Sequence, residues 1–153
     1  MTLSDLLASS DALHGLRAAD KRGLLDDLAG RAARSLGLDR AVVAAALHRR
    51  EDLGSTGVGG GVALPHARLD AVPRPYALLA RLREGIDFDA VDERPVDLVC
   101  LLLLPTDEQG GNLNVLACAA RLLHDPGTAT ALRGARDAHA LLAVVGGHAP
   151  GRP

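Results

Sequence analysis

The sequence is poor in aromatic residues and in excess charge, and each shortage excludes a class of function. Tyr76 and Phe88 are the only aromatic residues among 153, so the chain lacks the stacking platforms that bind single-stranded nucleic acid. The 17 basic and 19 acidic residues give a net charge of −2, which offers no electrostatic basis for nucleic-acid binding. We therefore expect an aliphatic core and no nucleic-acid partner.

Cysteine and long apolar runs are also scarce. Cys100 and Cys118 are too few for a disulfide framework, and we expect both to be buried thiols of a cytoplasmic protein. The N-terminal segment contains Asp5 and lacks the basic start and long apolar stretch of a signal peptide. The longest apolar run, around residues 99–104, is too short to span a bilayer, so we expect no membrane insertion.

The hydrophobic pattern predicts helices on both sides of a buried strand. Asp20 is the expected N-cap of a first helix, and Gly37 follows its last apolar residue, Leu36, as the expected C-cap. Further helices are predicted at residues 41–50, 112–124, 128–133 and 138–145, with Pro126 ending the third. Strands are predicted at residues 12–16, 62–64, 76–83 and 96–104, the last being central because it is nearly all apolar.

This arrangement predicts an α/β fold, a three-layer α/β/α sandwich. The length favours one domain over residues 1–153, with residues 147–153 as a flexible tail. Residues 54–61 are rich in glycine, and we expect no regular structure there.

The glycine-rich segment and the histidine after it carry the most chemical information. Glycine lets backbone N–H groups converge on an anion, but the Lys-Ser/Thr of a P-loop is missing, and a sharp crossover loop would also need glycine. His66 follows Pro65, which fixes the direction of the chain at the expected strand end. An imidazole beside Arg50 and Arg68 is suited to accept a phosphoryl group, although the pattern alone also fits a histidine without a catalytic role.

Other catalytic classes find no support in the sequence. The remaining histidines are scattered, without the His/Cys spacing of a zinc site, so no metal is expected. A Gly-x-Ser-x-Gly nucleophile elbow is absent, so a serine hydrolase is not expected either.

Residues 53–68, Leu-Gly-Ser-Thr-Gly-Val-Gly-Gly-Gly-Val-Ala-Leu-Pro-His-Ala-Arg, strongly resemble the signature of type-2 enzyme IIA domains. These domains belong to the bacterial phosphoenolpyruvate-dependent phosphotransferase system, in its fructose/mannitol and nitrogen-regulatory branches. The resemblance covers most of the chain and implies a mixed sheet flanked by helices. It also implies that His66 is the phosphorylated histidine. The residues that it places around the phosphoryl group are Arg50, Ser55, Thr56, Gly59, Gly60, Arg68 and Asn112.

Two residues differ from the family pattern. Gly60 stands where many members have asparagine, which is a mild change. Asn112, followed by Leu113 and Asn114, stands where the family usually has a second active-site histidine. The nucleophile is intact, so the difference at Asn112 concerns the rate of transfer.

The resemblance implies a stoichiometric phosphohistidine carrier that needs no cofactor, because its donor is a histidine phosphocarrier protein of the HPr type. The nitrogen-regulatory branch is favoured, with regulatory proteins as targets. One alternative is a sugar-specific enzyme IIA that passes the phosphoryl group to a transporter IIB domain. Another is a regulator that binds its target without phosphotransfer. The acidic residues of segment 84–97 fit either a solvated connection or a rim that attracts a basic carrier.

Overall fold

The computed structural model describes residues 11–106 and 111–146, with backbone only at residues 111–113. The tail predicted at residues 147–153 lies outside this range. In chain order the elements are β1 (Ala12–Leu16), α2 (Lys21–Leu36), α3 (Arg40–Asp52), β2 (Gly57–Gly59), β3 (Val62–Ala63), β4 (His66–Arg68), β5 (Tyr76–Ile86), β6 (Val96–Leu104), α4 (Gly111–His124), α5 (Pro126–Gly134) and α6 (Ala138–Gly146).

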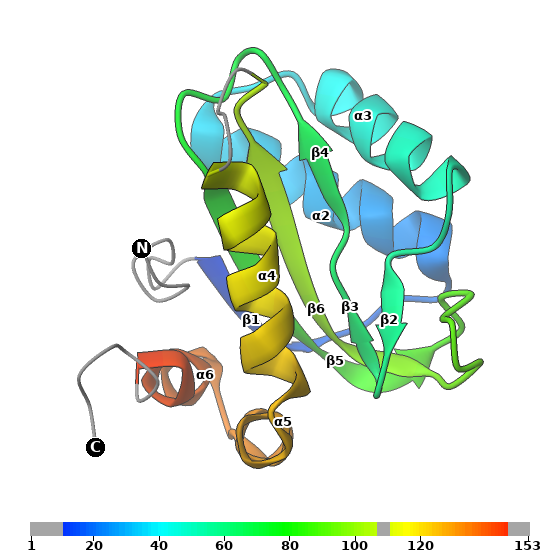
Figure 1. Ribbon diagram of the computed structural model, residues 1–153, viewed down its shortest axis with the longest axis vertical. Helices are drawn as coiled ribbons and strands as arrows, with labels where there is room; N and C mark the ends of the chain where they lie inside the picture. The colour runs from blue at the N-terminus through cyan, green and yellow to red at the C-terminus, as the bar shows by residue number, and fades with distance from the viewer. Residues whose placement is uncertain (1–10, 107–110, 147–153) are drawn as a thin grey trace.

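The strands form one mixed sheet in the order β1-β5-β6-β3-β2, with β4 also paired to β6 (Figure 1). β5 and β6 are antiparallel, whereas β1 is parallel to β5, and both β3 and β4 are parallel to β6. Helices α2 and α3 pack against one face of the sheet, and α4, α5 and α6 contribute to a second core on the other face. The predicted three-layer α/β/α sandwich is therefore confirmed.

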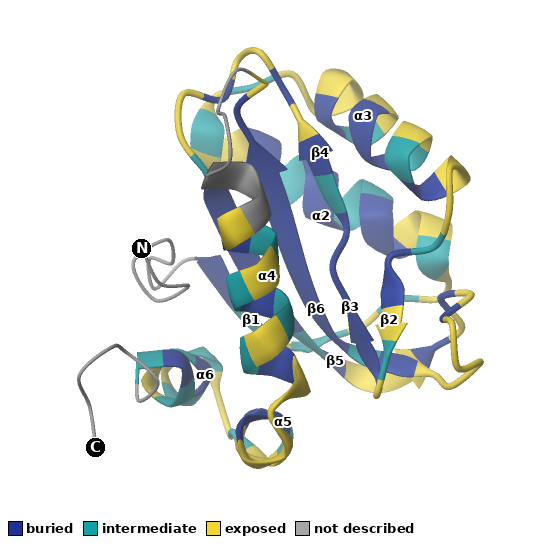
Figure 2. Cartoon of the chain, viewed as in Figure 1, coloured by how far each residue is buried: buried dark blue, intermediate teal, exposed yellow. Residues whose placement is uncertain are grey.

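The central strand β6 is covered on both faces, as its apolar sequence predicts (Figure 2). Its residues from Leu98 to Leu104 are all buried, and they alternate between the two cores. Because its neighbours pair with it along nearly its whole length, β6 fixes the register of the segments that carry the candidate site.

Local capping signals explain the boundaries of the first helix. The Asp20 carboxylate accepts a hydrogen bond from the Gly23 N–H at 2.8 Å, and Gly37 ends the helix with φ of 70°. Both caps agree with the prediction. In the part of the chain that the structure describes, no helix combines the length and apolar character needed to cross a membrane.

Two predictions about local structure are wrong. Residues 54–61 are not irregular throughout, because β2 pairs with β3 in an antiparallel hairpin. His66 does not end a strand but begins β4, opposite Leu102. The third predicted helix ends at His124, before Pro126, as expected, and Pro126 also opens α5, with Asp125 as its N-cap.

Candidate active site

His66 lies at the start of β4, and the backbone of the preceding turn holds its ring. The Nδ1 atom of His66 is 2.9 Å from the carbonyl oxygen of Leu64. Because a carbonyl oxygen can only accept a hydrogen bond, Nδ1 carries the proton in this arrangement. The lone pair of the neutral ring is therefore on Nε2, which is the atom available as a nucleophile.

The half-buried imidazole lines a cavity of about 330 Å³ between α3, β4 and α4. Its lining residues are Ala46, Arg49, Arg50, His66, Ala67, Arg68 and Leu116. Three arginines thus line the same cavity as the imidazole, and no carboxylate belongs to this described lining. Such a set of donors fits the charge and the oxygen atoms of a phosphoryl group.

The surroundings of His66 favour the neutral, nucleophilic form of its ring. Burial lowers the pKa of His66 below its usual 6.5, and the positive charges of Arg50 and Arg68 lower it further. The hydrogen bond to the Leu64 carbonyl and the negative charge of Glu51 act in the opposite direction. The net effect is a lowered pKa, so the ring is neutral at pH 7.

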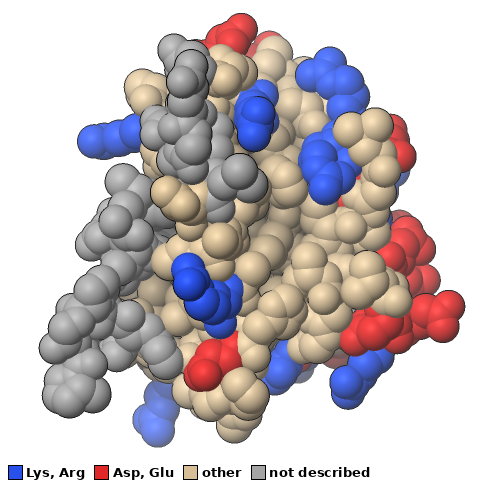
Figure 3. Space-filling view, viewed as in Figure 1, with Lys and Arg blue, Asp and Glu red and all other residues tan. Residues whose placement is uncertain are grey.

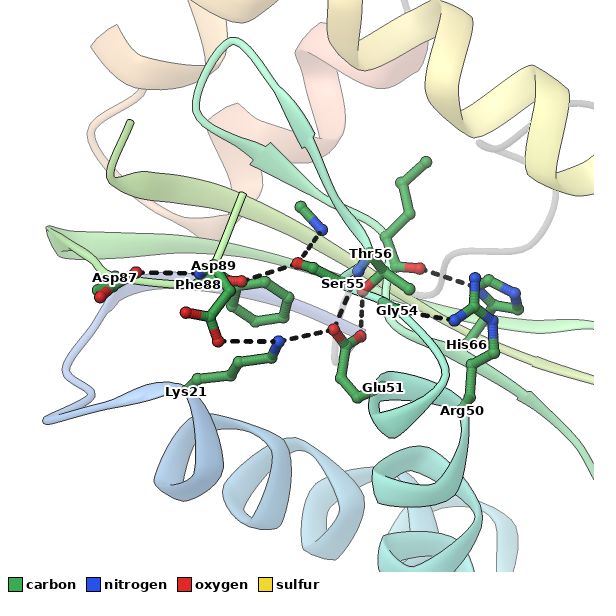
Figure 4. Close-up of polar contacts among 12 residues, drawn as sticks. Lys21, Arg50, Glu51, Gly54, Ser55, Thr56, His66, Asp87, Phe88 and Asp89 are labelled. Atoms are coloured by element: carbon green, nitrogen blue, oxygen red, sulfur yellow. Dashed lines mark hydrogen bonds and ion pairs between the residues drawn. The ribbon is translucent and has the colours of Figure 1, made fainter. Parts of the chain in front are cut away.

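Arg50 and Arg68 are brought together with His66 as predicted from the sequence, since all three line the cavity. Arg50 extends from the last turn of α3, and its guanidinium donates to the carbonyl oxygen of Gly54 at 2.9 Å. This bond ties the arginine to the loop that follows its own helix (Figure 4).

Ser55 and Thr56 do not line the cavity. The Ser55 hydroxyl donates to the carbonyl oxygen of Phe88 at 2.8 Å and accepts from the N–H of Gly57 at 3.0 Å. The Thr56 hydroxyl donates to the carboxylate of Glu51. Both hydroxyl groups therefore hold the loop after α3 in place, and neither is free to contact a phosphoryl group in this conformation.

Gly59 and Gly60 are not close to His66, which corrects their assignment as phosphoryl-binding residues. They lie at the turn of the β2–β3 hairpin, where the carbonyl oxygen of Gly61 accepts hydrogen bonds from the N–H groups of Asp97 and Leu98. His66 pairs with Leu102, which lies four residues beyond Leu98 along β6. Four residues of strand span about 13 Å.

Hydrogen bonds already occupy the polar groups of that turn. The N–H of Gly60 donates to the carboxylate of Asp92 at 2.9 Å, and its carbonyl oxygen accepts from Arg133 at 2.9 Å. His124 Nε2 lies 3.2 Å from the carbonyl oxygen of Gly59. The turn is thus held by side chains from α4, from α5 and from the connection before β6.

Asn112 belongs to the first turn of α4, but its side chain lies outside what the structure describes. The role that the resemblance gives it remains a prediction. Among the described residues, no group of three or more histidine, cysteine, aspartate or glutamate side chains is placed to hold a metal ion.

Glu51 was not predicted as a site residue from the sequence, and its side chain is only 5% exposed. Its carboxylate accepts from the N–H and the hydroxyl of Thr56 and lies 2.9 Å from Nζ of Lys21 (Figure 4). A signal was present in the sequence, since Val43, Leu47 and Glu51 follow one another at intervals of four and share the buried face of α3.

Comparison with known proteins identifies the family of the chain. Residues 6–146 match the family model described as the phosphoenolpyruvate-dependent sugar phosphotransferase system, EIIA 2. A nitrogen regulatory protein of Bradyrhizobium diazoefficiens is 42% identical over 145 residues, which are 95% of each chain. One from Escherichia coli is 33% identical over 95% of this chain and 90% of its own length.

The fold agrees as well. The crystal structure of nitrogen regulatory protein IIA-Ntr from Neisseria meningitidis superposes with a TM-score of 0.88 at 31% identity, covering 94% of this chain and 98% of that one. The Escherichia coli IIA mannitol structure, at 20% identity and a TM-score of 0.77 over 91% of this chain and 98% of its own, shares the fold. The chain belongs to the EIIA 2 family of the phosphoenolpyruvate-dependent sugar phosphotransferase system, as a phosphoryl carrier of the nitrogen-regulatory type.

Proposed function

We propose that His66 accepts a phosphoryl group on Nε2 from a histidine phosphocarrier protein, so that the chain acts as a stoichiometric phosphohistidine carrier. The observation that supports this most directly is the hydrogen bond between Nδ1 of His66 and the Leu64 carbonyl, which leaves Nε2 unprotonated toward the arginine-lined cavity. A neutral imidazole with a fixed tautomer is a competent nucleophile at pH 7.

The transfer is a displacement at phosphorus between two imidazoles. The Nε2 lone pair forms the new N–P bond while the N–P bond of the donor breaks, and the donor imidazole leaves with that electron pair. The ring of His66 gains positive charge as the bond forms, and the Leu64 carbonyl stabilises it through the Nδ1 proton. Arg50 and Arg68 face the oxygen atoms of the phosphoryl group during its transfer. Neither a metal nor another cofactor takes part in this step.

The output of the carrier is part of the same proposal. In a protein of the nitrogen-regulatory type, the phosphorylation state of His66 would decide which target protein is bound. We further propose that the chain forms a single domain and works in the cytoplasm, where its phosphocarrier donor would be found.

The proposal is tested by incubating the protein with phosphoenolpyruvate and the two upstream proteins of the phosphotransferase system. The expected result is a mass increase of one phosphoryl group that is labile in acid and stable in base. His66→Ala should abolish the increase, whereas His124→Ala, which removes an exposed histidine near the hairpin turn, should leave it intact. Labelling that persists in His66→Ala would refute His66 as the acceptor, and an unlabelled parent protein would support a regulator without phosphotransfer.

A further inference from the structure

We propose that Glu51 is a positioning residue for phosphoryl transfer, which fixes both the loop held by Arg50 and the carbonyl that orients His66. Lys21 holds the Glu51 carboxylate in place. This inference rests on the proposed function of His66 and adds two residues to it that do not touch the phosphoryl group.

The Glu51 carboxylate is buried and fully engaged. The N–H of Thr56 donates to one of its oxygens at 2.9 Å, and the Thr56 hydroxyl donates to the other. The Lys21 ammonium lies 2.9 Å from the first oxygen, with only 20% of the Lys21 side chain exposed. An ion pair between a buried carboxylate and a partly buried ammonium is weak evidence for stability, because the cost of desolvation offsets much of the attraction. A role in positioning gives a reason for its presence next to the cavity.

A chain of hydrogen bonds connects this carboxylate with the nucleophile. Thr56, which donates to Glu51, accepts at its carbonyl oxygen from the N–H of Leu64 at 2.9 Å. The carbonyl oxygen of Leu64 then lies 2.9 Å from Nδ1 of His66. The position of Thr56 therefore sets the position of Leu64, and Leu64 sets the tautomer and direction of the imidazole.

A second connection leads to Arg50. Glu51 holds the loop from Gly54 to Thr56 at Thr56. Arg50 holds it at Gly54, because its guanidinium donates to the Gly54 carbonyl at 2.9 Å (Figure 4). Loosening of the loop would release the carbonyl that helps to orient Arg50. A displacement of about 1 Å in such a group is enough to slow a reaction strongly.

Lys21 ties this network to the connection before β6. Its Nζ atom lies 4.7 Å from the centre of the Phe88 ring and 3.6 Å from the carboxylate of Asp89. The ring of Phe88 is fully buried, so the ammonium is packed on one side and paired on the other. Lys21 also offsets the charge of Glu51, which would otherwise act unbalanced on an incoming phosphoryl group.

The inference is tested with Glu51→Gln and Lys21→Met, and with Asp27→Asn as a matched control that breaks an ion pair to Arg31 elsewhere on α2. Described charged groups near His66 are Arg49, Arg50 and Glu51 of α3 and Arg68 of β4, while α4 contributes Leu116 to the cavity. The first readout is the titration of the His66 imidazole by NMR, which does not require phosphorylation. The second is the rate of phosphoryl transfer over a range of phosphocarrier concentrations.

We expect Glu51→Gln to lower the pKa of His66 and Lys21→Met to raise it, because the first removes a negative charge and the second leaves that charge unbalanced. Both variants should reduce the maximal transfer rate about tenfold with little change in KM for the phosphocarrier. In an Arg50→Ala background, Glu51→Gln should have a smaller effect, since part of its action passes through Arg50. Asp27→Asn should match the parent in both readouts.

Parent-like titration and transfer in folded Glu51→Gln would overturn the inference. So would pKa shifts of the same sign in Glu51→Gln and Lys21→Met, because a general loss of structure would move both variants alike. If Glu51→Gln does not fold, the titration of His66 in Lys21→Met tests the inference alone. A raised pKa of His66 supports the inference, and an unchanged or lowered pKa overturns it. Failure of the parent to accept a phosphoryl group would overturn the proposed function, while the NMR titration would still show whether Glu51 acts on His66.

Discussion

Gly57 is a position where a single methyl group should disturb the site. A Cβ built there would lie 2.9 Å from both Cα and Cβ of Ala90 and 3.3 Å from the Phe88 ring. Relief of this contact requires a backbone shift, and overpacking of that kind costs about 1–3 kcal/mol. The shift would also weaken the bond from the Val91 N–H to the Gly57 carbonyl, which measures 3.0 Å and contributes roughly 1 kcal/mol. We expect Gly57→Ala to lower the free energy of unfolding by about 2–4 kcal/mol.

Urea unfolding measures this effect. With an m-value of roughly 2 kcal/mol/M, the midpoint should fall by about 1–2 M without a change in slope. Gly134→Ala is the matched control, because a Cβ on this last residue of α5 has no neighbour within 4 Å. That variant should gain about 0.4–1 kcal/mol from a less flexible unfolded chain. A Gly57→Ala protein within about 0.5 kcal/mol of the parent would refute the reasoning from close packing.

Three further predictions concern the transfer reaction. The decline of the transfer rate at acid pH should have its midpoint below 6.5, because burial, assisted by Arg50, lowers the pKa of His66. A decline centred above 6.5 would contradict this sign. The exposed acidic residues beside β2 are expected to attract a basic carrier (Figure 3), so Asp87→Asn combined with Glu93→Gln should slow phosphorylation at low salt and have a smaller effect at high salt. Equal effects at both salt concentrations would indicate a solvated connection. Asn112→Asp should slow transfer markedly, because the new carboxylate and a charge of the phosphoryl group, about 5 Å apart at an effective dielectric of 20, would repel by roughly 3 kcal/mol. An unchanged rate would indicate that residue 112 lies away from the phosphoryl group.

The parts of the fold that follow from local signals could be predicted from the sequence. β6 spans the predicted residues, because a short and almost continuous apolar run is typical of a strand covered on both faces. α2 begins after Asp20 and ends before Gly37, because both caps depend on residues within a few positions of the helix end. In these cases the determining interactions lie within a short stretch of chain.

The strands that were missed depend on distant partners. β4 has three residues, and its strand character comes from pairing with Leu102–Leu104 of β6, more than thirty positions away. β2 is mostly glycine, which disfavours strands, and its pairing with β3 gives it its conformation. Packing in the two hydrophobic cores stabilises these short strands, and a local sequence pattern does not reveal that packing.

The candidate site divides in the same way. Its first part, His66 with Arg50 and Arg68, could be found from residue types and from the family signature, and the structure brings these three side chains to one cavity. Its second part, Glu51 with Lys21, joins residues thirty positions apart from the ends of two helices. In the sequence Glu51 lies in a run of charged residues that resembles an exposed helix end, and only its spacing from Val43 and Leu47 indicates the buried face of α3.

The glycine-rich segment has a role different from that of a phosphate-binding loop. Its positive φ angles at Gly60 and Gly61, 67° and 78°, form the hairpin turn, and side chains such as Asp92 and Arg133 already bind the backbone of that turn. In the proposed function, the positive charge for the phosphoryl group comes instead from arginines at the end of α3 and on β4. The glycines allow a short hairpin to pack closely against β6 and the connection before it, and this packing fixes the direction in which the chain enters β4. If His66 is the phosphoryl acceptor that we propose, the segment contributes to transfer through the position of His66, about 13 Å from the glycine turn itself.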